Sequence, residues 1–169
     1  MKHRAIHAIV LALSLSFSAA PLSAANVQPL YDGFEPIENS KAFQRYLRRA
    51  ETEQSKLVYL LERFSHAAFT VLFDGYRYEP KLVAGFARVF LLQKYSGHTA
   101  SVFIKEWAHR SLITGEPIKI ELPNGEVRFL SDILLEELSY LEEIRGIMKM
   151  VDARKAHGSA ASPESVKGA

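Results

Sequence analysis

Histidine and hydroxyl side chains are the groups in this sequence that could take part in catalysis. His66, His98 and His109 are the histidines of the region expected to fold, and no two of them have the i, i+4 spacing that places two ligands on one face of a helix. The chain has no Cys, which excludes thiolate metal sites, a catalytic thiol and disulfides. We therefore predict no metal site and no cofactor, and the spacings assign no catalytic residue.

Residues 111–117 form a polar segment between an expected helix and an expected strand. Loops of this kind often present contacts to partners, so Ser111, Thr114 and Gly115 are a candidate interaction loop. The alternative is that Thr114 and Gly115 only end the helix and reverse the direction of the chain.

The same segment leaves a catalytic alternative open. In a small hydrolase, Ser111 or Thr114 would be the nucleophile and His98 or His109 would be the base, because a hydroxyl needs a neighbouring base to take its proton. This chemistry requires about 3 Å between the hydroxyl oxygen and the ring nitrogen.

Arginine side chains gather between residues 41 and 50. Arg45, Arg48 and Arg49, accompanied by Lys41 and Tyr46, make a candidate anion patch. The alternative is an ordinary charged outer face, because exposed charges are common and contribute little.

Two acidic pairs, Glu136-Glu137 and Glu142-Glu143, fall in the last expected helix. Paired carboxylates carry out glycoside hydrolysis, but adjacent helical residues point about 100° apart. We interpret both pairs as part of a solvated helix face beside Arg145.

The first 25 residues have the organisation of a signal peptide. A basic start is followed by an apolar stretch over residues 5–17, which is shorter than the ~20 residues that cross a bilayer. Ser23 and Ala25 place small side chains where a signal peptidase requires them. We predict cleavage before Asn26 and export to the periplasm, with no transmembrane segment after cleavage; an uncleaved membrane anchor is the alternative.

The charge balance argues against a polyanionic partner. The chain carries 21 Lys and Arg against 19 Asp and Glu, a formal net charge of +2 at pH 7. Cleavage removes Lys2 and Arg4 and leaves a formally neutral chain. A neutral chain has no global field to attract nucleic acid, so no nucleic-acid partner is predicted.

The remaining sequence predicts one α+β domain over residues 40–152, between an extended leader at 26–39 and a disordered tail at 153–169. About four helices are expected to pack on two short antiparallel β-hairpins, because neither hairpin alone can bury its apolar face. The first helix is continuous from 40 to 66 or is interrupted near Glu51 with Thr52 capping a second helix; the others cover about 80–95, 100–111 and 131–151.

The two hairpins are expected to turn at Asp74-Gly75 and at Asn124-Gly125, pairs that supply the positive φ angles of a two-residue turn. This geometry fixes the facing residues and gives each hairpin a continuous apolar face. The expected pairs are Phe73 with Tyr76, Val71 with Tyr78, Leu122 with Val127 and Ile120 with Phe129.

Residues 99–117 resemble a known family. The segment Thr99-Ala100, Phe103-Ile104, Ala108, Ser111, Ile113-Thr114-Gly115 and Pro117 is similar to the most recognisable stretch of the YfeK-like family, small exported bacterial proteins of unknown function. Looser agreement extends the resemblance over about Thr52 to Leu141. Where the family tends to carry His and Arg before the Lys that ends a helix, this chain has Phe90 and Leu92. The resemblance implies export and a shared fold, and implies no activity.

These observations favour a non-catalytic binding or structural module of the cell envelope. Its expected partner is an envelope protein or peptide, and the hydrolase described above is the alternative function.

Overall fold

The computed structural model describes residues 29–159 and has an α+β fold. Within this range five α-helices accompany one four-stranded antiparallel sheet, so the expected four helices and two separate hairpins match only in outline. A short 3₁₀ helix precedes them at Ile37–Asn39. The elements are α1 (Lys41–Leu47), α2 (Glu53–Phe64), β1 (Thr70–Phe73), β2 (Tyr76–Tyr78), α3 (Pro80–Lys94), α4 (Ala100–Trp107), β3 (Lys119–Glu121), β4 (Val127–Phe129) and α5 (Leu130–Ser159).

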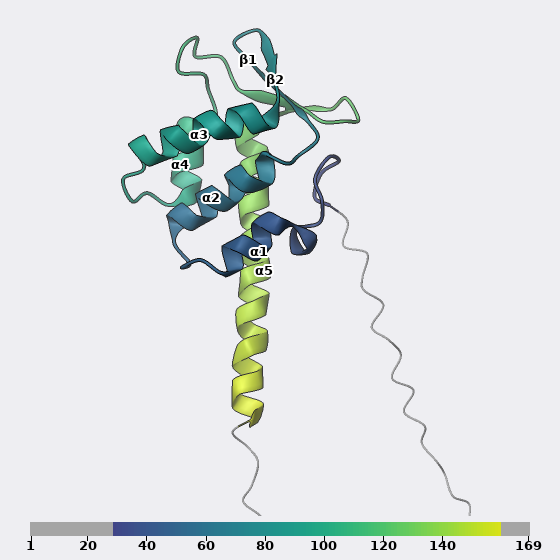
Figure 1. The fold of residues 1–169 in the computed structure, drawn as a ribbon, viewed down its shortest axis with the longest axis vertical. Coiled ribbons are helices and arrows are strands. Elements are labelled where there is room, and N and C mark those ends of the chain that lie inside the picture. Colours follow the sequence, from purple (N-terminus) through teal and green to yellow (C-terminus); the bar gives the residue numbers. More distant parts are fainter. Residues whose placement is uncertain (1–28, 160–169) are drawn as a thin grey trace, which may run out of the picture.

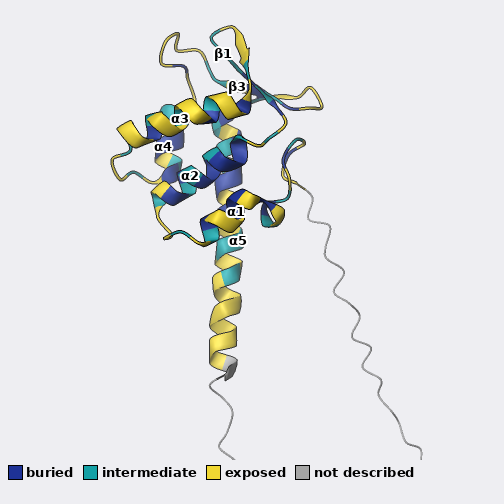
Figure 2. Cartoon of the chain, in the orientation of Figure 1, coloured by how far each residue is buried: buried dark blue, intermediate teal, exposed yellow. Residues whose placement is uncertain are grey.

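The sheet lies at the end of the molecule where α5 begins, and α3, α2 and α1 follow one another along α5 (Figure 1). The later part of α5 extends beyond the other elements, and its surface there is exposed (Figure 2). None of the helices between residues 29 and 159 combines the length and the apolar character needed to cross a bilayer.

The first predicted helix is divided, as the second of the two alternatives expected. α1 ends at Leu47, and Thr52 caps α2, because its side-chain oxygen accepts a hydrogen bond from the Ser55 N–H. In return, the Ser55 hydroxyl oxygen accepts a hydrogen bond of 3.0 Å from the Thr52 N–H. This reciprocal capping box satisfies N–H groups at the new helix start and makes the interruption stable.

Within the described residues, the segments on both sides of the predicted domain differ from the expected leader and tail. Tyr31, Phe34 and Ile37, from the segment expected to be an extended leader, are buried in the core. α5 continues to Ser159, so residues 153–159 are helical where a disordered tail was expected. The predicted signal peptide at 1–25 and residues 160–169 lie outside the described residues.

The two hairpins join into a single sheet with the strand order β2-β1-β3-β4. The first hairpin has the predicted register, with Phe73 opposite Tyr76, because Asp74 and Gly75 adopt φ angles of 52° and 76°. β1 also pairs with β3, which places Val71 opposite Ile120, and both side chains are fully buried.

The predicted register of the second hairpin is wrong by one residue. Ile120 faces Arg128 instead of Phe129, because Pro123, Asn124 and Gly125 form a three-residue loop. The Leu122 N–H donates to the Glu126 carbonyl, the Gly125 N–H donates to the Leu122 carbonyl, and Gly125 has a φ of 86°. This is the turn-plus-bulge form of a hairpin. As a result Phe129 and Val127 are about half exposed instead of joining the core.

Two groups of buried side chains form the core. One lies among α1, α2, α4 and α5, and the other lies between the sheet, the start of α5 and the segment before α1. α3 contributes Leu91 to the first group and Ala84 to the second, so this helix spans the junction between them.

Candidate functional site

The candidate interaction loop is tied to the turn of the first hairpin. The Asp74 carboxylate accepts hydrogen bonds from Ser111 Oγ, at 2.8 Å, and from Thr114 Oγ1. Ser111 Oγ also accepts from the Ile113 N–H, and the Gly115 N–H donates to the Ser111 carbonyl. Gly115 has a φ of 74°, which favours glycine. The structure therefore brings the three predicted residues together, and their polar groups hold the loop in place.

The histidines proposed as bases lie outside this hydrogen-bonded group. Within residues 29–159, no hydrogen bond joins Ser111 or Thr114 to His98 or His109, and His98 Nδ1 lies 3.0 Å from Ser96 Oγ instead. The hydroxyl groups of the loop are arranged as donors to a carboxylate.

The candidate anion patch is partly assembled around a buried glutamate. Glu62 of α2 lies 2.6 Å from Arg49 and 3.8 Å from Arg45, whereas Arg48 is exposed and forms no ion pair within the described residues. Arg88 of α3 also approaches Glu62, at 3.6 Å. Sequence reasoning missed Arg88 because it lies far along the chain from the other arginines. One carboxylate thus meets three guanidinium groups.

α3 exposes a stripe of large apolar side chains, which we call the α3 stripe: Leu82, Phe86, Val89 and Leu92. Their exposed fractions lie between 50% and 72%. The opposite side of α3 is also apolar and packs on the core, so the helix is apolar on both sides. Sequence reasoning predicted only a helix over about 80–95, although a helix without a polar face is normally buried all round.

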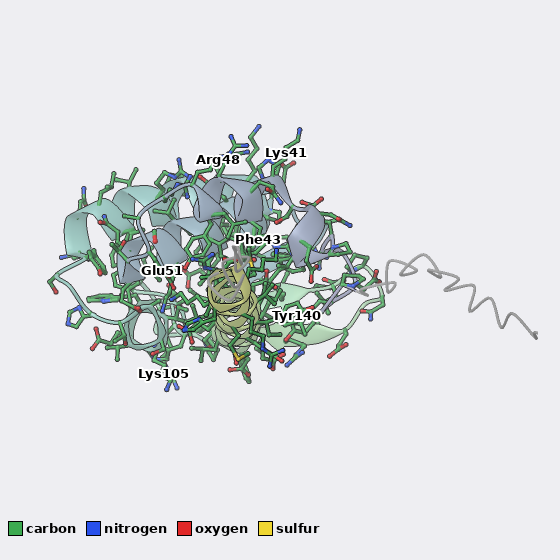
Figure 3. The ribbon with its side chains drawn as sticks, turned by 90° about the horizontal axis from the view of Figure 1, so that it is seen from below. Lys41, Phe43, Arg48, Glu51, Lys105 and Tyr140 are labelled. Atoms are coloured by element: carbon green, nitrogen blue, oxygen red, sulfur yellow. The ribbon has the colours of Figure 1, made fainter. Side chains whose placement is uncertain are left out.

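Cations surround the α3 stripe without balancing acids on the same elements. Lys81, Arg88 and Lys94 belong to α3, and residues 80–94 and 41–50 contain no Asp or Glu. Seen along α5, Lys41 and Arg48 point outward from α1, away from α5 (Figure 3). We call α3 and α1, with the arginines that meet Glu62, the basic apolar face.

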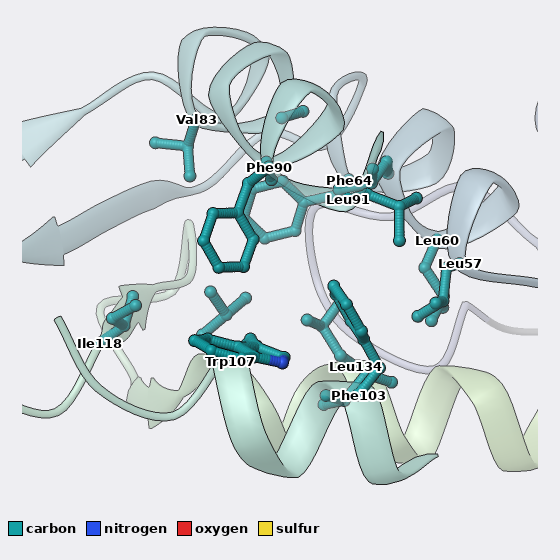
Figure 4. Close-up of a pocket in the computed structure, with 16 residues that line it drawn as sticks. Leu57, Leu60, Phe64, Val83, Phe90, Leu91, Phe103, Trp107, Ile118 and Leu134 are labelled. Atoms are coloured by element: carbon teal, nitrogen blue, oxygen red, sulfur yellow. The ribbon is translucent and has the colours of Figure 1, made fainter. Parts of the chain in front are cut away.

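An apolar cavity of about 140 Å³ lies beneath α3 (Figure 4). Its walls come from α2, α3, α4 with the residues after it, Ile118 and α5. Trp107 is partly buried in this wall, and Phe90 packs edge-on against it at 5.1 Å between ring centroids. The two positions where the sequence departs from the YfeK-like pattern therefore lie in the cavity wall, at Phe90, and on the α3 stripe, at Leu92.

A buried ion pair connects α2 with α5. Glu137 Oε1 accepts hydrogen bonds from Arg63 Nε at 2.8 Å and from the Tyr59 hydroxyl at 2.7 Å. Burial, reinforced by the negative charge of Glu137, raises the pKa of Tyr59 far above its usual range. The expected solvated position of Glu137 is wrong: the residue is 2% exposed. Its spacing of three residues after the partly buried Leu134 and four before the buried Leu141 could have revealed this.

A second ion-pair group joins α2 to α4 and α5. Lys56 donates to Glu142 and lies 2.7 Å from Glu53, and these contacts raise the pKa of Lys56 although its burial acts in the opposite direction. Glu53 accepts from the N–H of Ala100, the first residue of α4. Contacts with Lys56 and with this N–H lower the pKa of Glu53. These groups have structural partners and leave no free reactive side chain.

The described residues contain no group of three or more His, Asp and Glu side chains placed to hold a metal ion. Comparison of the chain with protein-family models, with curated proteins and with solved structures gave no match.

Proposed function

We propose that this protein is an exported, non-catalytic binding module of the bacterial cell envelope that docks on an anionic phospholipid surface through the basic apolar face. The observation that carries the proposal is the exposed α3 stripe in a helix that has cations and no acids. Exposed apolar side chains beside basic side chains are typical of protein surfaces that lie on membranes.

The shape of the face favours a membrane over a groove-binding peptide. The stripe from Leu82 to Leu92 is about 15 Å long at 1.5 Å per residue, and α3 carries exposed surface along its length (Figure 2). A convex apolar stripe can enter the boundary between headgroups and acyl chains, whereas a peptide helix needs a groove.

Charge complementarity identifies the kind of lipid. Within the described residues, Glu62 is the only acid within 4.0 Å of the cations of α1 and α3 and of Arg48 and Arg49. Each Lys or Arg near the surface of an anionic bilayer contributes about 1 kcal/mol to binding, and this contribution falls off over a distance of about one Debye length from the surface. The local excess of positive charge therefore compensates for the neutral total charge of the cleaved chain.

Vesicle co-sedimentation tests the proposal. The protein should bind vesicles that contain phosphatidylglycerol and should bind phosphatidylcholine vesicles much more weakly, with the difference decreasing as salt is added. Full burial of a Phe side chain contributes about 1.5–3 kcal/mol, so Phe86→Ser should weaken binding about tenfold because Phe86 is 66% exposed and available to the lipid. Arg88→Gln should weaken binding about fivefold.

Phe129→Ser is the matched control, because it removes the same side chain from an exposed site on β4, which is not part of the basic apolar face. It should leave vesicle binding unchanged. Equal binding to both kinds of vesicle, no binding to either, or equal effects of Phe129→Ser and Phe86→Ser would refute the docking proposal. Crosslinking of the face to one envelope protein, without vesicle binding, would replace the lipid with a protein or peptide partner.

The export part of the proposal rests on residues 1–25 and has its own test. N-terminal sequencing of the protein recovered from cells should begin at Asn26, and a sequence that begins at Met1 would overturn it.

We also propose membership of the YfeK-like family, supported by the conformation of the resembling segment: Thr99 caps α4, and Gly115 closes the following loop in a left-handed conformation.

A further inference from the structure

The cavity beneath α3 lies where the two groups of core side chains meet. Leu57 and Phe103 in its wall belong to one group, and Phe64 and Leu130 belong to the other. Three alanines, at positions 84, 87 and 108, line the same space. Small side chains at a junction between two cores leave a volume that neither core fills.

The size of this cavity corresponds to a small organic molecule. An apolar cavity of about 150 Å³ holds one benzene ring, so about 140 Å³ accommodates six or seven heavy atoms. The wall side chains are aliphatic or aromatic, which excludes an ionic ligand, because a buried charge needs a charged or hydrogen-bonding partner.

One polar atom in the wall adds a requirement. Trp107 Nε1 is buried and has no hydrogen-bond acceptor among residues 29–159. Figure 4 shows the indole ring in the cavity wall with its nitrogen at the edge nearer Phe103 and Leu134. A buried N–H without an acceptor is unfavourable by about 1–3 kcal/mol, and a ligand oxygen within reach would remove this penalty.

We infer that the cavity is a binding site for a small, uncharged, mainly hydrocarbon molecule of six or seven heavy atoms with one hydrogen-bond acceptor, which accepts from Trp107 Nε1. Phe90, Trp107 and Ala108 are only partly buried, so the ligand enters on the side where α3 and α4 face each other. The inference goes beyond membrane docking and does not depend on it, since the cavity lies on the inner side of α3.

Two probe molecules of seven non-hydrogen atoms distinguish the contribution of the hydrogen-bond acceptor from that of the hydrocarbon. Cyclohexanone has a carbonyl oxygen and methylcyclohexane has none. The chain contains one Trp, so ¹⁵N-labelled protein gives a single indole N–H resonance. Saturating cyclohexanone should move this resonance downfield, whereas methylcyclohexane should bind without that downfield shift.

Three variants test where the probes bind and whether Trp107 donates a hydrogen bond to them. Ala87→Leu extends a side chain into the cavity and should abolish binding of both probes, while Gln93→Leu adds the same side chain at an exposed site of α3 and should leave binding unchanged. Trp107→Phe keeps an aromatic ring without the donor. It should weaken the binding of cyclohexanone about threefold to tenfold more than the binding of methylcyclohexane, with both affinities measured from backbone amide chemical shifts.

The alternative outcomes are distinct. Circular dichroism and urea unfolding first establish that each variant is folded. Native binding by Ala87→Leu would show that the probes bind elsewhere. Equal weakening of both probes by Trp107→Phe, or an indole resonance that does not move at saturation, would remove the hydrogen bond from the inference. Absence of saturable binding by either probe would overturn the site as a whole, and vesicle docking would be unaffected by any of these results.

Discussion

Removing the carboxylate of Glu137 should be among the most destabilising single changes in this protein. The Arg63 and Glu137 side chains are 4% and 2% exposed, and they lie 2.8 Å apart. In Glu137→Leu the Arg63 guanidinium keeps its hydrogen bond to the Glu35 carbonyl but loses its buried counter-ion, and the Tyr59 hydroxyl loses its acceptor. Breaking a buried ion pair by removing one partner destabilises by about 3–5 kcal/mol, so we expect a loss of about 4 kcal/mol.

The double variant Arg63→Met with Glu137→Leu separates the ion pair from simple packing. Both charges are then absent, and replacing a buried pair with apolar side chains is often neutral or stabilising. We therefore expect the double variant to be more stable than Glu137→Leu alone, with a coupling free energy of about 2 kcal/mol or more. Urea unfolding followed by far-UV circular dichroism gives the free energies by linear extrapolation.

Glu136 provides the matched control, because it is adjacent in sequence, exposed, and paired with Arg128 on the surface. Glu136→Leu should change the free energy of unfolding by less than about 1 kcal/mol. The reasoning is refuted if Glu137→Leu is no more destabilising than Glu136→Leu. It is also refuted if the loss in the double variant equals the sum of the losses measured separately for Glu137→Leu and Arg63→Met.

Three further predictions concern the turns and the buried tyrosine. Gly125→Ala should lower the free energy of unfolding in urea by about 1 kcal/mol, because the φ of 86° is unfavourable for a residue with a Cβ; an unchanged value would contradict the bulged hairpin. Asp74→Asn keeps a residue that tolerates a positive φ but replaces one acceptor oxygen, so amide hydrogen exchange at Thr114 should become faster while α2 stays protected. Tyr59 retains its proton in the folded protein, whereas an unfolded Tyr ionises near pH ~10; stability should therefore be complete below that pH and decrease above it, and Tyr59→Phe should reduce the decrease measured by urea unfolding between neutral and alkaline pH.

Local chemistry made part of this fold predictable. Caps and turns depend on a few neighbouring residues, so Thr52 as an alternative helix start and the Asp74-Gly75 turn could be recognised from the sequence. The register of the second hairpin was missed for an equally local reason. Pro123 already fixes the first central residue of the turn, which moves Gly125 into the bulge position.

Features that depend on distant contacts could not be read in this way. Nothing near Arg88 shows that it will meet Glu62, and the pairing of β1 with β3 follows only when the intervening helices are placed. The α3 stripe is a similar case, because periodicity shows that a helix is apolar on both sides but does not show which side remains uncovered. Ser111, Thr114 and Gly115 lie together because they are neighbours in sequence, whereas the hydrogen bonds that tie their loop to Asp74 depend on the fold.

The order of the strands also determines when the sheet can form as the chain emerges from its N-terminus. The β1–β2 hairpin precedes β3 in the chain, and β3 covers one of its edges only after α3, α4 and the following loop have emerged. A two-stranded hairpin is marginally stable alone, and an uncovered strand edge can pair with other chains. A chain that emerges from its N-terminus therefore carries an open strand edge beside Val71 until Glu121 has emerged.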